Sequence, residues 1–204
     1  MRPRNGLQPR MIDTCSRCGR GVPGRLVGGK NAMTRPKGDL MNATYLVRGD
    51  DLTVLHPLAV RQAPASTSPR ALIWGVDLRE SPSRMAAKRE LRQACRDAYT
   101  YAKSWPSVVH VVVAYAQSAG LPSGACLATA AHSASRAHAE IERSRGRYVD
   151  VVVLDVTGCE SGELLRDRVM EAISTRPGAA GDAALPWEDL TAHTIHEAAM
   201  QQTY

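Results

Sequence analysis

The chain has 204 residues, enough for one α/β domain with a sizeable core and a small appendage, and its hydrophobic fraction of 44% is ordinary for a globular protein. Aromatic residues make up only 4% and Phe is absent, so a core must be built from Val, Leu, Ile and Ala. No apolar run approaches the ~18 residues of a membrane span, and the basic N-terminus lacks the apolar segment of a secretory signal, which argues against membrane and secreted classes. The five scattered cysteines do not form a disulfide pattern, so a reducing cytoplasm is the expected location.

Positive charge is concentrated at the N-terminus. Residues 1–40 hold nine Lys or Arg against two Asp, a net charge of +7, whereas the whole chain carries +6, so residues 41–204 sum to −1. Basic arms often contact nucleic acid, and a solubilising leader is the alternative. The candidate nucleic-acid contacts are six residues of this arm: Arg17, Arg20, Arg25, Lys30, Arg35 and Lys37.

A candidate metal site also falls in the N-terminal region. Cys15 and Cys18 form a Cys-x-x-Cys pair, the spacing that presents two thiolates to one Zn²⁺. The nearest third ligand is His56, which follows a segment, residues 45–55, that is predicted to be a β-hairpin with its turn at Arg-Gly-Asp. Because this order is similar to a degenerate zinc ribbon, we expect residues 1–62 to form a basic arm and a small hairpin module with Zn²⁺ as a candidate cofactor.

An α/β domain is predicted after a Pro- and Ser-containing linker at residues 63–70. Three short apolar runs rich in β-branched residues, separated by helical patterns, cover residues 71–77, 108–115 and 148–155. Near-continuous apolar runs suit strands that are buried on both faces of a parallel sheet, and their alternation with helices indicates right-handed βαβ units. We therefore predict that residues 71–176 form a three-layer α/β sandwich with a mainly parallel sheet in the order βαβαβα.

The helical patterns show apolar stripes with basic residues outside them. Ser81 and Pro82 are predicted to begin the first helix, as its N-cap and first residue. The inward positions are Leu91, Cys95, Ala98 and Ala102 in the first helix, Leu127, Ala131, Ala134, Ala137 and Ile141 in the second, and Leu165, Val169, Ala172 and Ile173 in the third. The outward basic positions are Arg84, Lys88, Arg89, Arg92 and Arg96 in the first helix and Arg136, Arg143 and Arg145 in the second.

The C-terminal part, residues 177–204, is predicted to be a linker and one helix. Pro and Gly at 177–181 break the chain, and a helix is expected from Pro186 onward. Trp187, Leu190 and Ile195 indicate that this helix docks either on the domain's own sheet or on a second subunit.

Candidate catalytic residues follow the predicted strands at their carboxyl ends, where open parallel sheets bind ligands. Asp77 and Asp155 are candidates for a pair of carboxylates that binds Mg²⁺ for phosphoryl transfer. Ser81 is an alternative candidate nucleophile, with Arg79 stabilising a phosphate. A third interpretation is that the two Asp cap helices and Ser81 is an N-cap. His110, inside the second strand, is expected to be an interior residue.

The order of these segments resembles the catalytic domain of the resolvase–invertase (serine recombinase) family over about residues 70–173. The resemblance is carried by Arg-Glu-Ser at 79–81, Arg-Glu-Leu-Arg-Gln-Ala-Cys-Arg at 89–96, the valine-rich run at 108–113 and Gly-Arg-Tyr-Val-Asp-Val-Val-Val-Leu-Asp at 146–155. It implies that the Ser of an Arg-x-Ser triplet, here Ser81 after Arg79, attacks a DNA phosphate.

The chain departs from that family in its arginines. No Lys or Arg occurs between Ser104 and Ser135, and Asp155 is followed by Val-Thr-Gly rather than by an Arg-containing run. Phosphoryl transfer to DNA needs several cationic groups to hold the developing charge. We therefore expect a diverged, non-catalytic, DNA-associated relative of the kind carried by mobile elements, with nucleic acid and a second copy of the chain as candidate partners. A Mg²⁺-dependent phosphoryl-transfer enzyme or nuclease is the alternative.

Overall fold

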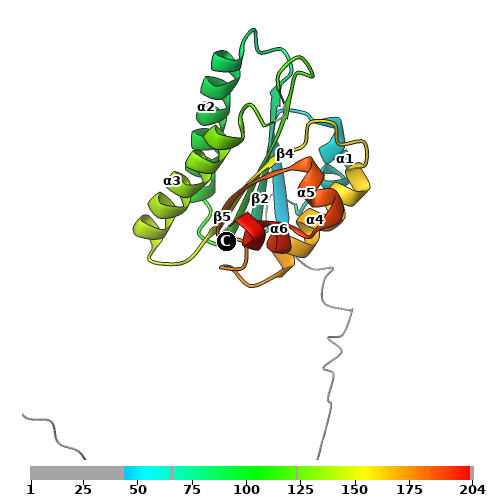
Figure 1. Cartoon of the computed structure of the whole chain (residues 1–204). Helices are drawn as coiled ribbons and strands as arrows, with labels where there is room; N and C mark the ends of the chain where they lie inside the picture. The colour runs from blue at the N-terminus through cyan, green and yellow to red at the C-terminus, as the bar shows by residue number, and fades with distance from the viewer. Residues whose placement is uncertain (1–43, 65–66, 123, 203–204) are drawn as a thin grey trace, which may run out of the picture. The chain divides into compact units, whose positions relative to one another are not determined.

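The computed structural model describes residues 44–64, 67–122 and 124–202. Within these residues, five parallel strands form one sheet in which the spatial order follows the chain. The strands are β1 (Tyr45–Gly49), β2 (Ala71–Leu78), β3 (His110–Gln117), β4 (Asp150–Asp155) and β5 (Asp182–Pro186). Helices cover both faces of the sheet (Figure 1), so the predicted three-layer α/β sandwich with a parallel sheet is confirmed.

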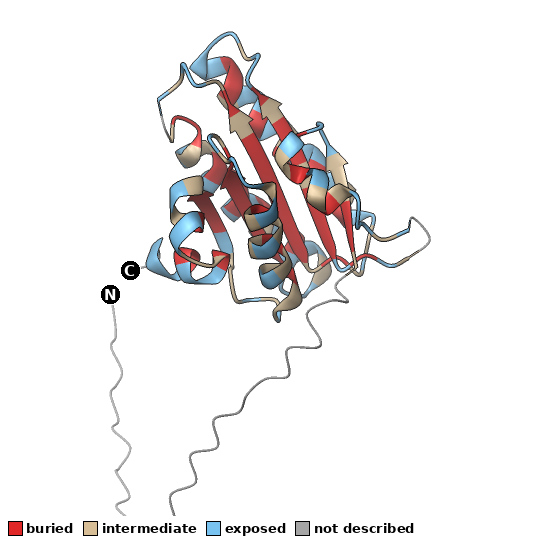
Figure 2. Cartoon of the chain, turned by 90° about the vertical axis from the view of Figure 1, so that its right-hand side faces the viewer, coloured by how far each residue is buried: buried red, intermediate tan, exposed pale blue. Residues whose placement is uncertain are grey.

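Two separate hydrophobic cores lie on the two faces of the sheet. On one face, α2 (Arg84–Lys103) and α3 (Leu127–Arg145) pack against the sheet and each other. On the other face lie η2 (Thr53–Leu55), α1 (His56–Ala59), α4 (Gly162–Ser174), α5 (Trp187–Ala192) and α6 (Ile195–Gln202). Buried strands therefore form a band between two helix layers whose outer sides are exposed (Figure 2). None of the helices in these residues combines the length and apolarity that crossing a membrane requires.

The connections between the strands do not all have the same hand. In a parallel sheet with sequential strand order, connections of one hand place all their helices on one face. Here α2 and α3 lie on one face, whereas α1 and α4, which connect β1 to β2 and β4 to β5, lie on the other. Two of the four connections are therefore opposite in hand to the other two, although such connections are nearly always right-handed. The two connections between the predicted strands, through α2 and α3, share one hand, and the reversed connections lead to β1 and β5, which were not predicted as strands of this sheet. This change of hand places helices on both faces of a sequentially ordered sheet.

The predicted apolar stripe of α2 is confirmed, because Leu91, Cys95, Ala98 and Ala102 are all fully buried. The predicted helix start at Ser81 is wrong. Ser83 is the N-cap, since its hydroxyl accepts a hydrogen bond from the backbone N–H of Ala86 at 3.2 Å.

The inward stripes of α3 and α4 agree with prediction at most positions. Ala134, Ala137 and Ile141 are buried in α3, but Ala131 is exposed and Ala130 is buried in its place. The three large residues of the α4 stripe, Leu165, Val169 and Ile173, are buried.

The predicted hairpin at residues 45–55 is wrong. Tyr45–Gly49 is β1, which pairs in parallel with β2, and the chain then turns into η2 instead of returning as a strand. Gly49 allows this turn because its φ is +86°, and a Cβ there would lie 2.2 Å from the carbonyl oxygen of Gly75. Burial decides the outcome, since Leu52 and Leu55 enter the same core as Tyr45, beneath the sheet.

The C-terminal region also differs from prediction. Within residues 177–202 the chain adds a fifth strand, β5, and two short helices, where one linker and one helix were predicted. Leu190 of α5 and Ile195 of α6 are buried in the core on the α4 side. Of the two predicted alternatives, docking on the domain's own sheet is therefore the one observed.

Candidate nucleic-acid interface

The two candidate carboxylates at the carboxyl edge of the sheet lie on opposite faces. Successive side chains of a strand point to opposite faces of the sheet. Leu78 belongs to the core under α2 and α3, so its neighbour Asp77 points to the face covered by α1 and α4. Asp155 faces α2 and α3, because it accepts a hydrogen bond from the hydroxyl of Tyr115, which lies in that core. The strand β3 also lies between β2 and β4. The structure therefore does not bring Asp77 and Asp155 together around one Mg²⁺ ion.

Asp77 and Arg79 form a local ion pair. The Nε of Arg79 donates to Asp77 Oδ1 at 2.8 Å, and the backbone N–H of Arg79 donates to the same oxygen at 3.0 Å. These contacts, above all the guanidinium hydrogen bond, hold the pKa of Asp77 below its usual range. The guanidinium of Arg79 is therefore already engaged by a carboxylate, which leaves it poorly placed to hold a phosphate.

Ser81 is likewise engaged, because its Oγ forms a hydrogen bond with Oε2 of Glu90 on α2. A nucleophilic serine needs a base that takes its proton and groups that hold the anionic transition state. Glu90 is the one titratable partner that the structure gives Ser81, and Arg79 is turned to Asp77. The arrangement does not assemble the site that the recombinase resemblance implies.

Asp155 has a structural environment. It is 5% exposed, and it accepts hydrogen bonds from the Tyr115 hydroxyl at 2.9 Å and from the backbone N–H of Thr157 at 3.1 Å. Thr157 in turn accepts a hydrogen bond from the backbone N–H of Gln117 at 2.9 Å. These hydrogen bonds connect the carboxyl ends of β3 and β4, so Asp155 stabilises this edge of the sheet.

His110 is an interior residue, as predicted. It is 3% exposed, and its Nδ1 lies 3.2 Å from Oδ2 of Asp150 on the neighbouring strand. The other carboxylate oxygen of Asp150 accepts hydrogen bonds from the backbone N–H groups of Gly178 and Gly181. The pair thus holds the loop before β5 against the amino end of the sheet.

The candidate zinc ligands are only partly within the described residues. Cys15 and Cys18 lie outside them, and so do the six arm residues Arg17, Arg20, Arg25, Lys30, Arg35 and Lys37. His56 is exposed and its Nε2 lies 2.8 Å from Oδ1 of Asp51. In residues 44–202, apart from the gaps noted above, no cluster of three His, Cys, Asp or Glu side chains is arranged to hold a metal ion.

The two helix layers carry opposite net charges. The helices α2 and α3, which we call the basic layer, hold nine Lys or Arg against four Asp or Glu, a net charge of +5. The helices α4, α5 and α6 on the opposite face, which we call the acidic layer, hold two Arg against six Asp or Glu, a net charge of −4. Although the net charge of residues 41–204 is close to zero, the domain has one positively charged and one negatively charged helix layer.

Most of the cations in the basic layer face solvent. Arg84, Arg89 and Arg92 are exposed along α2. Arg145 is the exception, since its guanidinium donates to the carbonyl oxygens of Ala102 and Val108 and so ties α3 to the end of α2. Burial accordingly lowers the pKa of Arg145.

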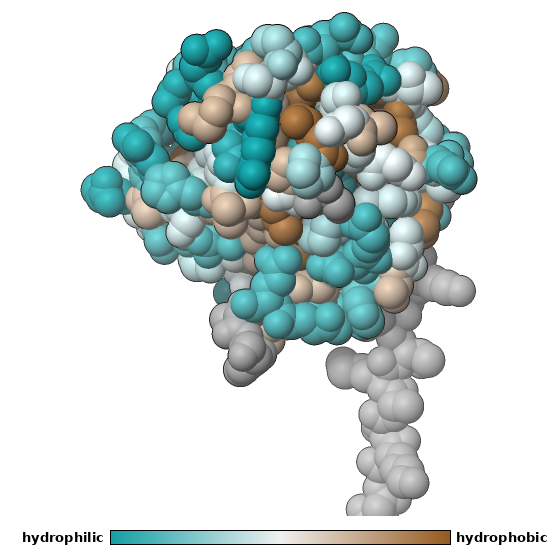
Figure 3. Space-filling model, turned by 45° about the horizontal axis from the view of Figure 1, so that its top comes forward, coloured by the Kyte–Doolittle hydropathy of each residue, from teal (hydrophilic) through white to brown (hydrophobic). Residues whose placement is uncertain are grey.

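The surface offers little apolar area for docking. The large hydrophobic side chains exposed in the described residues are Val60, Met85, Tyr148 and Met200, which come from four different elements or loops. In Figure 3, hydrophilic residues cover most of the visible face, and hydrophobic ones appear between them in small groups.

The basic layer was not identified as a site from the sequence, although eight of its nine cations, all except Lys103, were placed outside an apolar stripe. The signal needed was the net charge of each helix together with the knowledge of which helices share a face.

No family model, curated protein or solved structure matches this chain.

Proposed function

We propose that the protein binds nucleic acid without catalysing a reaction on it, and that the basic layer contacts the phosphates. The observation that carries the proposal is the segregation of charge into a +5 layer and a −4 layer on opposite faces of the sheet. Phosphate contacts by Lys and Arg supply most of non-specific nucleic-acid affinity, and a one-sided positive surface is the electrostatic footprint of such binding.

Two further features support the proposal. The N-terminal arm adds a net +7 to the same chain, so it supplies a second set of candidate phosphate contacts. The engaged side chains of Arg79 and Ser81 favour a binding protein over a recombinase. The recombinase resemblance favours DNA as the nucleic acid.

The test is the affinity of the full chain for a short labelled DNA duplex, measured by fluorescence anisotropy over a range of salt concentrations. Log K should fall linearly with log[salt], with a slope of about −0.9 per phosphate neutralised. Arg89→Gln, on the exposed side of α2, should weaken binding and reduce the slope by about one unit. Arg61→Gln, an exposed arginine after α1 and outside the basic layer, is the matched control and should change neither. Binding that is absent, or equally sensitive to both substitutions, would overturn the proposal.

A further inference from the structure

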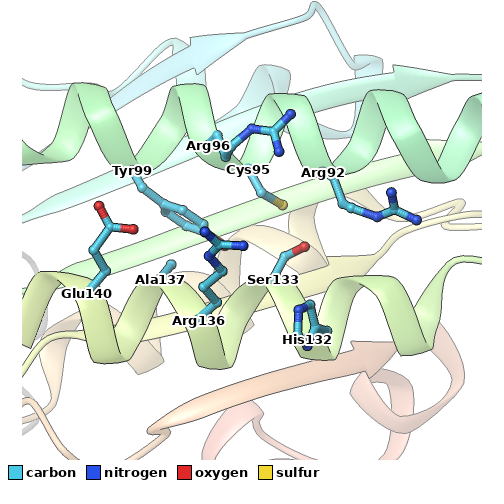
Figure 4. Close-up of a pocket in the computed structure, with 9 residues that line it drawn as sticks. All are labelled: Arg92, Cys95, Arg96, Tyr99, His132, Ser133, Arg136, Ala137 and Glu140. Carbon is cyan, nitrogen blue, oxygen red and sulfur yellow. The ribbon is translucent and has the colours of Figure 1, made fainter.

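A groove runs along the outer surface where α2 and α3 lie side by side (Figure 4). It encloses about 110 Å³. It is lined from α2 by Arg92, Cys95, Arg96 and Tyr99, and from α3 by His132, Ser133, Arg136, Ala137 and Glu140. The groove thus gathers three arginines from two helices around a small space.

Only part of the positive charge in this groove is balanced by the protein, since Glu140 interacts electrostatically with Arg136. Glu140 is the only carboxylate in the lining, and it is already paired with Lys103. Within the described residues, neither Arg92 nor Arg136 has an ion pair or a side-chain hydrogen bond, whereas Arg96 donates to Gln93. Guanidinium groups bind phosphate oxygens with paired, charge-assisted hydrogen bonds, and both of these arginines line the groove.

The floor of the groove supplies a buried donor. Tyr99 is 8% exposed, and within the described residues the one polar group beside its hydroxyl is the thiol of Cys95, a weak hydrogen-bond partner. In Figure 4 the Tyr99 and Cys95 side chains point from α2 toward the space between the helices, and Arg136 extends from α3 toward α2. A thiol satisfies a buried hydroxyl only weakly, and an anion in the groove would accept a stronger hydrogen bond from Tyr99.

The groove is suited to binding and not to covalent chemistry. A cysteine among arginines is an arrangement in which a thiolate nucleophile can be stabilised. Here burial raises the pKa of Cys95 to about 11, so the residue is a neutral thiol at neutral pH. Ser133 is also occupied, since its hydroxyl donates to the carbonyl oxygen of Thr129 at 2.8 Å.

We propose that the α2–α3 groove is a binding site for one phosphate group, held by the neighbouring Arg136 guanidinium and Tyr99 hydroxyl, with Arg92 further along the groove adding positive charge. This inference rests on the proposed function for the source of the phosphate, which is the nucleic-acid backbone. The same chemistry would accept a free phosphate, so the experiment uses both probes.

The experiment compares the full-length wild type with Arg136→Gln, Tyr99→Phe and Arg89→Gln, an exposed arginine of α2 that does not line the groove. Inorganic phosphate is titrated while the backbone amide resonances of Ser133 and Ala137 are followed by NMR, and binding of the DNA duplex is measured by anisotropy. Arg136→Gln should weaken phosphate binding about tenfold and Tyr99→Phe about threefold, the loss expected for one charge-assisted and one weaker hydrogen bond. Arg89→Gln should leave phosphate binding unchanged.

The outcomes separate this inference from the proposed function. Phosphate binding in the groove without any DNA binding would support the site and refute the proposed function. DNA binding that Arg136→Gln weakens no more than Arg89→Gln does, without phosphate-induced shifts at Ser133 and Ala137, would refute the site and leave the function standing. Equal loss of phosphate binding in Arg136→Gln and Arg89→Gln would also overturn the site.

Discussion

The hydrogen bond between Tyr115 and Asp155 provides a quantitative test of the carboxyl edge of the sheet. Tyr115 is fully buried, Asp155 is 5% exposed, and the hydroxyl of Tyr115 lies 2.9 Å from Asp155 Oδ2. Tyr115→Phe leaves the ring in place and removes one of the two donors to a buried carboxyl group. Hydrogen bonds to charged groups contribute about 1.5–3 kcal/mol, so we expect the free energy of unfolding to fall by about 2 kcal/mol.

The assays are urea unfolding of the full chain, which gives the free energy of unfolding, and thermal unfolding, which gives Tm, both followed by tryptophan fluorescence. A loss of this size should lower Tm by roughly 4–8 °C for a domain of this length. Tyr148→Phe is the matched control, since Tyr148 is 41% exposed and should tolerate the loss of its hydroxyl. Tyr115→Phe with wild-type stability would refute the assignment of Asp155 to a structural role. A double-mutant cycle with Asp155→Asn isolates the coupling between the two side chains.

Three further predictions concern the core, the pH dependence of stability and the metal. Leu91→Asp places an unpaired charge at a fully buried position and should unfold the domain, so a normal thermal melt of this variant would contradict the packing of α2. Burial raises the pKa of Cys95 from 9.0 to about 11, so the contribution of the neutral thiol to stability is complete below pH 9 and is lost as pH rises through 11. The loss of stability at alkaline pH should therefore be smaller in Cys95→Ala. An identical dependence of stability on pH in the variant and the wild type would contradict this prediction. If Cys15 and Cys18 bind zinc, metal analysis of full-length protein purified under reducing conditions should find it and Cys15→Ser should lose it, whereas metal-free wild type would exclude the site.

The central part of the fold was predictable because its signals are local. The valine-rich runs of β3 and β4 are apolar on both sides, so they indicate strands in a sheet that is covered on both faces. The apolar stripe from Leu91 to Ala102 indicates which side of α2 is buried. The strand β5 gave no such signal, because Ala183 and Ala184 are small and lack β-branching and its five residues end at Pro186. The strand β1 followed by Gly49 has the local pattern of a hairpin, and its long-range pairing with β2 and the burial of Leu52 and Leu55 prevent one.

The candidate site was less predictable because it depends on long-range arrangement. Asp77 and Asp155 both lie at the carboxyl ends of their strands, at the same edge of the sheet. Because side chains alternate between the two faces along a strand, their positions in β2 and β4 turn them to opposite faces. The groove requires α2 and α3 to lie side by side on one face, whereas α4 lies on the other because the hand of its connection is reversed. No local pattern in the chain encodes that reversal.

The most direct test of the central claim is to map which face of the domain meets nucleic acid. Titrating the isotope-labelled full chain with a short DNA duplex at low salt, and following the backbone amide resonances, reports contacts on every helix in one experiment. We expect the shifts of the described residues to concentrate on α2 and α3, around Arg89, Arg92 and Arg136, and to disappear at high salt. Shifts concentrated on α4, α5 and α6, or no shifts at all, would contradict the assignment of the basic layer as a nucleic-acid interface.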